Sequence, residues 1–333
     1  MSIKVPSMSK RPACRAFTPG VYWRVGCHTP GPHGVQPPVV GWGHMDEAPV
    51  IPAEKTLLVA TEGWSDAGEA ASSALRMIVD QYGLIPYEVI SDEIYFDYQV
   101  SRPYAQFESD GSRVISWPDI TLYGPDTADP TPGSPYVLLG AEPSRMWQSL
   151  ADQIVMQALA EDIQHIVLCG AMLADVPHSR PVRLLSSSED GEIRELLDIE
   201  RSTYEGPVGI LSVVGQAAHQ SGIPVVNLWA QVPHYVHTSP SPKATLAIVE
   251  RLRELLGIDV PHADLTEQAT AWEENINQLA SEDDDMMAYI HQLEKQRDTV
   301  ESPEASGDAI AQEFERYLQK RPEWPGGVAG GEG

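Results

Sequence analysis

The chain has 333 residues, of which 42% are hydrophobic and 21% are charged, a composition typical of a globular protein with a sizeable core. Its 48 acidic residues outnumber its 22 basic residues, so the formal net charge is −26. A polyanion repels phosphate backbones and anionic lipid head groups, which argues against nucleic acid and against a membrane surface as partners.

Targeting segments and cysteine content indicate the cellular compartment of the protein. No apolar run is long enough to predict a transmembrane helix, and the N-terminus lacks the apolar segment of a secretory signal. The chain has only 3 cysteines, too few for a disulfide framework. We therefore expect a cytoplasmic protein.

Residues 1–47 differ in composition from the rest of the chain. They are rich in proline and glycine and contain no acidic residue before Asp46. Such a segment buries too little apolar surface to offset its ordering entropy, so we expect a disordered head. Met45 offers an alternative start, in which case the head precedes the native protein. Four residues of metal-ligating types fit no zinc spacing well: Cys14, Cys27, His28 and His33.

Short apolar runs alternate with helical patterns over residues 48–260. The pattern predicts strands at 57–60, 87–90, 136–140, 165–169 and 225–229, and a hairpin from 113–116 and 120–123. It predicts helices at 71–79, 144–161 (capped by Ser144) and 243–256 (ended by Gly257), and a strand at 208–211 that passes directly into a helix. Such alternation indicates an α/β core with a doubly wound, mostly parallel sheet.

A helical appendage is predicted over residues 261–322. Apolar residues repeat at coiled-coil spacing in Leu265, Ala269, Trp272, Ile276 and Leu279. A second helix is expected to start at Ser281, a third to span 308–320, and the Gly-rich tail at 323–333 to be disordered. From 263 to 320 there are 15 acidic and 4 basic residues. We favour packing of this appendage on its own core, with a partner-binding arm as the alternative.

Three polar loops follow predicted strands, where open α/β sheets place their ligands. They span residues 62–68, 177–181 and 229–237. No phosphate-binding loop, dinucleotide fingerprint, nucleophile elbow or zinc motif is present, so we assign no catalytic residue, metal or cofactor. The candidate ligand-binding residues in these loops are Trp64, Ser65, Asp66, His178, Arg180, His234 and Tyr235.

Several interpretations of these loops stay open. A Ser–His–Asp arrangement would use Ser65 or Ser179 with His178 or His234 and with Asp66. A metal site would use the same two histidines with Asp66. An anion site would use Arg180 with a helix N-terminus after Gly68 or Gly209. We favour a structural interpretation, in which Asp66 caps a helix and the histidines and Arg180 hold loops.

The same loops resemble a known family. Glu-Gly-Trp-Ser-Asp-Ala-Gly at 62–68, Pro-His-Ser-Arg-Pro at 177–181 and Leu-Trp-Ala-Gln-Val-Pro-His-Tyr at 228–235 resemble the actinobacterial branch of the PAC2 (proteasome assembly chaperone 2) family. The resemblance spans about residues 55–320. It implies an α/β core similar to that of purine nucleoside phosphorylase, with a small helical C-terminal subdomain, and homotrimers are expected.

The resemblance also has implications for the function of this chain. Eukaryotic and archaeal members help to assemble proteasome α-rings, and several dock through a C-terminal hydrophobic–Tyr–any tripeptide. This chain ends Val328-Ala329-Gly330-Gly331-Glu332-Gly333, which does not match that tripeptide. The nearest candidate, Tyr317, is not terminal and follows Arg316 in place of an apolar residue, so we do not expect docking by that route. We therefore expect a non-enzymatic, homo-oligomeric assembly chaperone or interaction factor, with proteasome subunits as expected partners. The alternative is a small-molecule binder or a hydrolase- or phosphorylase-like enzyme that uses the polar loops.

Overall fold

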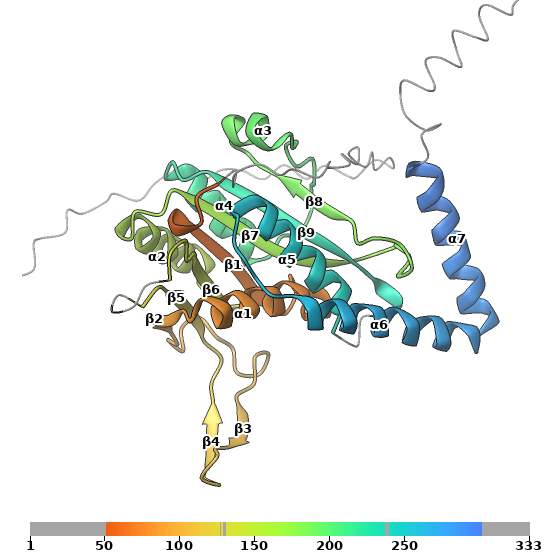
Figure 1. The fold of residues 1–333 in the computed structure, drawn as a ribbon. Helices are drawn as coiled ribbons and strands as arrows, with labels where there is room; N and C mark the ends of the chain where they lie inside the picture. Colours follow the sequence, from red (N-terminus) through yellow and green to blue (C-terminus); the bar gives the residue numbers. More distant parts are fainter. Residues whose placement is uncertain (1–50, 127, 129–130, 237–239, 302–333) are drawn as a thin grey trace, which may run out of the picture. The chain divides into compact units, whose positions relative to one another are not determined.

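The computed structural model describes residues 51–301 except 127, 129–130 and 237–239 (Figure 1). Several expectations fall outside these residues. They are the disordered head at 1–47 with Cys14, Cys27, His28 and His33, the third helix at 308–320 and the tail at 323–333 with its C-terminal sequence.

A seven-stranded mixed sheet forms the centre of the fold, in the order β2-β5-β6-β1-β7-β9-β8. Strands β6, β1, β7 and β9 run parallel to one another. Strand β5 is antiparallel to β2 and β6, and β8 is antiparallel to β9. The strands are β1 (Thr56–Glu62), β2 (Ile85–Ile90), β5 (Ile120–Gly124), β6 (Tyr136–Ala141), β7 (His165–Ala174), β8 (Leu184–Ser187) and β9 (Val225–Pro233). A separate two-stranded sheet pairs β3 (Tyr104–Phe107) with β4 (Arg113–Ser116).

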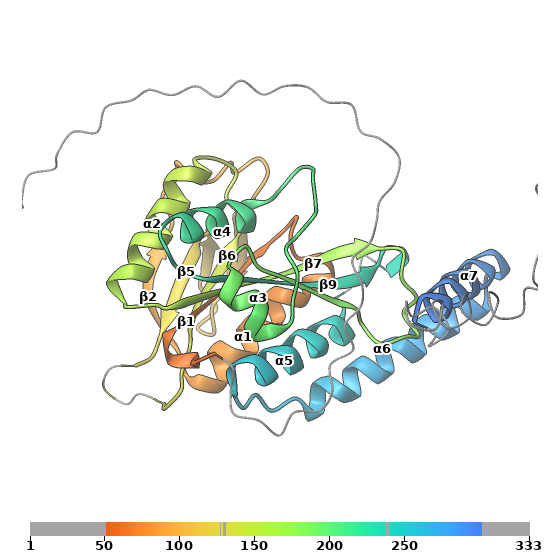
Figure 2. The same ribbon diagram turned by 90° about the horizontal axis from the view of Figure 1, so that it is seen from above.

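Helices cover both faces of this sheet (Figure 2). On one face lie α1 (Ala70–Tyr82), α3 (Gly191–Leu197) and α5 (Pro242–Leu256), and on the other lie α2 (Trp147–Ala160) and α4 (Ile210–Gln220). Side chains of β1 alternate between these layers: Leu58 and Ala60 join the first cluster, and Leu57 and Val59 join the second. The expected α/β fold with a mostly parallel sheet is confirmed.

The predicted hairpin of 113–116 with 120–123 is wrong. β4 pairs with β3, whereas β5 enters the main sheet between β2 and β6. The link between β4 and β5 is held in the sheet, because the Asp119 carbonyl oxygen accepts a hydrogen bond from the Ala141 amide at 2.8 Å. Strand β3 was not predicted, and neither were β8 and α3.

Two predicted helix starts are also corrected. Residues 208–211 form no strand, because α4 begins at Ile210, whose amide donates to Glu142 Oε1 at 3.2 Å. Ser144 does not cap α2, which begins three residues later at Trp147 after Met146 in the left-handed conformation. The Ser144 amide instead donates to the Tyr95 carbonyl oxygen at 2.8 Å. The predicted end of α5 is confirmed, since Gly257 adopts φ 63° at its C-terminus.

The C-terminal helices are α6 (Ala263–Ser281) and α7 (Asp284–Glu301), and α6 packs against α5. The expected seam holds for Leu265, Ala269 and Ile276, which are buried. Leu279 is 61% exposed, and Ala280 is buried in its place. The reason is that positions seven residues apart rotate gradually around the axis of a straight helix, so a seven-residue repeat does not stay on one face.

The start of α7 differs from the one expected. Ser281 belongs to α6 and does not cap α7. The cap is Asp283, whose Oδ1 accepts the amides of Asp285 and Met286 at 3.0 Å each. The described residues also form three short 3-10 helices: η1 (Ala53–Lys55), η2 (Ala67–Glu69) and η3 (His234–Val236). Within the described part of the chain, no helix is long and apolar enough to cross a membrane.

Gly140 permits the close approach of the 119–120 backbone to β6. A Cβ at this position would lie 2.1 Å from the Asp119 carbonyl oxygen and 2.7 Å from the Ile120 Cα. We expect Gly140→Ala to reduce the free energy of unfolding by at least about 2 kcal/mol, because backbone atoms cannot yield as a side chain would. Urea unfolding measures the change.

Gly191→Ala is the matched control. Its Cβ would meet nothing nearer than Arg194 Nη2, at 3.7 Å, so we expect a change within about 0.5 kcal/mol. Equal midpoints for the Gly140→Ala variant and the wild type would contradict the packing argument.

Candidate functional site

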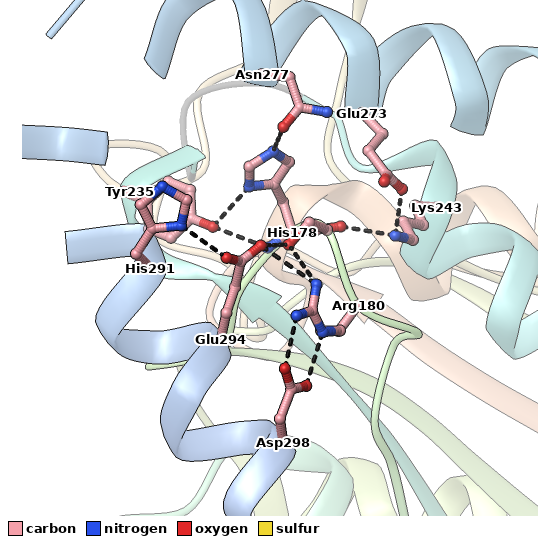
Figure 3. Close-up of polar contacts among 10 residues, drawn as sticks. His178, Arg180, Tyr235, Lys243, Glu273, Asn277, His291, Glu294 and Asp298 are labelled. Carbon is pink, nitrogen blue, oxygen red and sulfur yellow. Dashed lines mark hydrogen bonds and ion pairs between the residues drawn. The ribbon is translucent and has the colours of Figure 1, made fainter. Parts of the chain in front are cut away.

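The candidate residues separate into two groups in the structure. Trp64, Ser65 and Asp66 lie in the turn that joins β1 to α1. The other four lie with the C-terminal helices: His178, Arg180, His234 and Tyr235 (Figure 3 shows three of them).

Asp66 caps the first helix. Its Oδ1 accepts the amides of Ala71 at 2.8 Å and Ser72 at 3.2 Å, at the N-terminus of α1. The backbone around it is tied to β7, since the Ser65 carbonyl oxygen accepts the Ala171 amide at 2.8 Å. Burial raises the pKa of Asp66, although the hydrogen bonds from Ser72 and Ala71 oppose that shift. The carboxylate is thus used in holding the fold.

Ser65 and Trp64 lie beside the N-terminus of α4. A Cβ on Gly209 would lie 2.7 Å from Ser65 Oγ, 3.0 Å from Glu142 Oε1 and 3.1 Å from the Trp64 ring. Ser65 is buried, and its Oγ has no hydrogen-bond partner among the described residues. Trp64 is 62% exposed.

The proposed anion site is not assembled in this arrangement. The N-terminus that follows Gly68 already holds the Asp66 carboxylate, and the one that follows Gly209 holds Glu142. A second anion would meet negative charge at both helix ends, where an empty N-terminus would have attracted it. Arg180, the third element of that hypothesis, is paired with α7.

His178 is at the centre of the second group (Figure 3). Its Nδ1 lies 2.9 Å from Tyr235 Oη, and its Nε2 lies 3.1 Å from Asn277 Oδ1 on α6. Because the Asn277 oxygen can only accept, the contacts suit a neutral ring that donates from Nε2 and accepts from Tyr235 at Nδ1. Burial lowers the pKa of His178, which favours that neutral form. Both ring nitrogens are therefore engaged within the fold.

The loop that carries His178 is also bonded through its backbone. The His178 amide donates to Tyr235 Oη at 2.8 Å, and its carbonyl oxygen accepts from Lys243 Nζ at 2.6 Å. Lys243, near the start of α5, also pairs with Glu273 on α6. One short loop is thereby joined to η3, α5 and α6.

Arg180 joins the same loop to α7. Its Nε and Nη2 donate to the two carboxylate oxygens of Asp298 at 2.8 and 2.7 Å, a bidentate arrangement, and its Nη1 lies 3.3 Å from Glu294. Ser179 Oγ donates to the same Glu294 carboxylate. The guanidinium lowers the pKa of Asp298, whereas the pKa of Glu294 is lowered chiefly by the hydrogen bond from Ser179.

Aromatic rings complete the second group. His234 contacts Tyr235 and Tyr289 of α7 edge to face, with ring centroids 5.7 and 5.6 Å apart. Its Nδ1 lies 3.2 Å from Asp175 Oδ1. Burial raises the pKa of Tyr235 to about 12, so its hydroxyl keeps its proton for the contacts described.

The chemistry open to these residues is limited by their contacts. Ser179 is paired with Glu294, and both nitrogens of His178 have partners, so neither forms a Ser–His pair here. The hollow beside His178, Arg180 and Trp272 has room for about one water, at ≈ 10 Å³. Among the residues that the structure describes, no group of His, Cys, Asp or Glu is suited to hold a metal ion.

Sequence reasoning missed the partners of these loops. They lie far along the chain and include Glu142, Lys243, Glu273, Asn277, Tyr289, Glu294 and Asp298. The sequence contained one signal of these partners. Glu294 and Asp298 are four residues apart, so their carboxylates share one face of a helix.

The chain matches the model of the PAC2 family over residues 60–280, which is more than half of its length. It therefore belongs to the PAC2 family, and the resemblance noted in the three loops is confirmed. No curated protein matches the chain in sequence.

Solved structures agree with this assignment. A Mycobacterium tuberculosis proteasome-assembly chaperone homologue is 35% identical, with a TM-score of 0.63 over 71% of this chain and 99% of that chain. A PAC2 family protein from Streptomyces avermitilis is 35% identical, with a TM-score of 0.62 over 70% and 98%. PbaB, an archaeal proteasome activator from Pyrococcus furiosus, is 13% identical with a TM-score of 0.53 over 70% and 96%, which shows a shared fold alone.

The buried neutral His178 links stability to pH. Its pKa is lowered in the folded chain, so the unfolded chain takes up a proton more readily. Its contribution to stability is complete above the unfolded value of 6.5 and is lost as the pH falls below that value. We expect the free energy of unfolding to decrease from about pH 7.5 to about pH 5, and His178→Gln to reduce that slope.

Urea unfolding at a series of pH values tests this linkage. Part of the slope should survive in the variant, because burial also lowers the pKa of His165. His219→Gln, a change at an exposed histidine near the end of α4, serves as the control. The same slope in the His178→Gln variant and the wild type would show that His178 is not the titrating group.

Proposed function

We propose that the chain is a non-enzymatic, homo-oligomeric PAC2-family protein that acts in the cytoplasm as an assembly chaperone or interaction factor for the proteasome. The observation that carries the proposal is the 35% identity to a proteasome-assembly chaperone homologue that is matched over almost its whole length. A homo-oligomer and proteasome subunits are thus the partners proposed.

The site geometry supports a role without catalysis. The imidazole of His178 is the group best suited to acid–base work, and it contacts Asn277 of α6. Ser179 and Arg180, beside it in the loop, are bonded to α7. A general base needs a free ring nitrogen within reach of the proton that it removes. In this arrangement His178 offers no such nitrogen.

The charge of the C-terminal helices supports a protein partner. Residues 263–301 contain 11 acidic and 2 basic residues. Some acids hold α6 and α7 against the core, but others, such as Glu267 and Glu274, are exposed on α6. We propose that this acidic surface meets a basic surface of a proteasome subunit, which would speed association through electrostatic attraction.

Affinity capture from the host lysate tests the proposal. We expect the full chain to retain proteasome α-subunits in stoichiometric amount, and Glu267→Lys with Glu274→Lys to reduce the amount retained at least about tenfold, because the attraction becomes repulsion. Mass spectrometry of the retained proteins gives the measurement.

The control makes the same charge change on another helix. Glu192→Lys with Glu195→Lys alters two exposed acids of α3 and should leave the captured amount unchanged. If the wild-type chain retains no α-subunits, the proteasome proposal is refuted. If both double variants lose the captured α-subunits equally, capture depends on the net charge of the chain and not on the acidic surface of α6.

A small-molecule binder or hydrolase- or phosphorylase-like enzyme is the second candidate. The observation that favours it is the buried Ser65 Oγ, which has no partner among the described residues and lies beside Glu142 at the start of α4. A buried hydroxyl without a hydrogen bond is rare in native proteins, and a polar ligand group would satisfy it. Trp64, Ser65 and Asp66 would then line a binding site at this end of the sheet.

A ligand screen separates the two candidates. A ligand that binds only the folded chain stabilises it by about 2.7 kcal/mol at about 100 times its dissociation constant. We expect no change in Tm with nucleosides, nucleotides or inorganic phosphate. A saturable rise in Tm that is lost in Ser65→Ala would instead establish the second candidate, and Ser73→Ala on α1 is the control.

A further inference from the structure

The hairpin of β3 and β4 is exposed on both faces. We call residues 100–118 the arm; it extends beyond the main sheet at the bottom of Figure 1. All four residues of β3 and three of the four in β4 are exposed. An isolated two-stranded hairpin is marginally stable in water, and three or more strands with a packed face are needed for stability. The arm therefore lacks the cover that such a sheet normally has.

Large apolar side chains are concentrated at this part of the surface. Five exposed large hydrophobic residues belong to the arm, with relative exposures of 50% to 76%: Val100, Tyr104, Phe107, Ile115 and Trp117. Concentrated exposed apolar residues mark interaction sites. Aromatic and arginine side chains, which the arm also carries, are enriched in interface cores.

The base of the arm is fixed to the core. Phe96 is buried in the cluster beneath α2 and α4, and the Tyr98 and Trp117 rings pack with their centroids 4.8 Å apart. Asp97 pairs with Arg145. These contacts hold β3 and β4 in one position, which lowers the conformational entropy lost when a partner binds.

Charge favours a second copy as the partner. The chain carries −26 overall, yet the arm carries two arginines and two acids and is neutral: Arg102, Arg113, Glu108 and Asp110. Two copies therefore repel least where their arms meet. A four-residue strand is about 14 Å long, which exceeds the Debye length of about 8 Å at physiological ionic strength. An arm-to-arm contact keeps the acidic bodies far enough apart for salt to screen them.

We propose that the arm binds the arm of a second copy by antiparallel pairing of β3 with β3. This inference rests on the homo-oligomer in the proposed function. Among the described residues, β4 is the sole neighbour of β3 in its sheet, which leaves the other edge of β3 open for pairing. Antiparallel pairing lays the base of one arm along the tip of the other, so Arg102 of each copy approaches Glu108 and Asp110 of the other. The product is a four-stranded sheet with twofold symmetry.

Sedimentation equilibrium of the full chain tests the pairing. Twofold pairing of the arms joins two copies, so we expect the wild-type mass of two chains and not of the three that the family resemblance implies. Tyr104→Glu with Phe107→Glu should raise the dissociation constant at least about tenfold, or about 1.4 kcal/mol. Both side chains are about three-quarters exposed, so the fold should survive, and urea unfolding verifies it. Leu196→Glu with Leu279→Glu is the control, because both residues are exposed outside the arm.

A charge exchange tests the orientation. Arg102→Glu should weaken self-association, and the further changes Glu108→Arg and Asp110→Arg should restore it. A wild-type chain with the mass of one chain overturns the proposal, as does a Tyr104→Glu, Phe107→Glu variant with wild-type mass or an equal loss in the control. The test is separate from proteasome capture: loss of α-subunit capture with intact self-association would refute the proposed function alone.

Discussion

Burial of β1 on both faces is the constraint on which the other elements depend. Six of its seven residues are buried, and their side chains point alternately into the two helical layers. The strands beside β1 are parallel to it, and parallel strands need crossover connections, here with helices that cover the sheet. The turns that follow β1, β7 and β9 therefore lie at the same end of the sheet and carry the polar residues there. The candidate residues thus follow from sheet packing. Their separation into two groups follows from which helix each turn meets.

The core was predictable because burial leaves a local pattern. Continuous apolar runs such as residues 57–60 and 165–169 identify strands without reference to the rest of the chain, and Gly257 identifies a helix end. Strand β3 has no such pattern, since it is exposed throughout. The hairpin prediction failed because strand partners are chosen by the whole sheet, where β5 lies between β2 and β6.

The site was predictable only in part, for a related reason. The loops were identified from their position after strands, and the structural roles favoured for Asp66, His178 and Arg180 agree with their contacts. Their partners on α6 and α7 are more than 90 residues away from the 177–181 loop, so no local pattern pairs them. A histidine and an arginine beside polar neighbours suggest catalysis in a sequence, while in the fold they connect secondary-structure elements.

The points at which the chain leaves the main sheet for the arm and re-enters it have an evolutionary consequence. Ile90, the last residue of β2, pairs with Ile120, the first residue of β5, so the chain leaves and re-enters the sheet at neighbouring points. Residues 91–119 can therefore be shortened, lengthened or replaced with little effect on strand register, as is usual for surface connections. Buried contacts at the base, such as Phe96, set the limit on how much can be removed. Selection can therefore change the surface that the arm presents without changing the strand order of the main sheet.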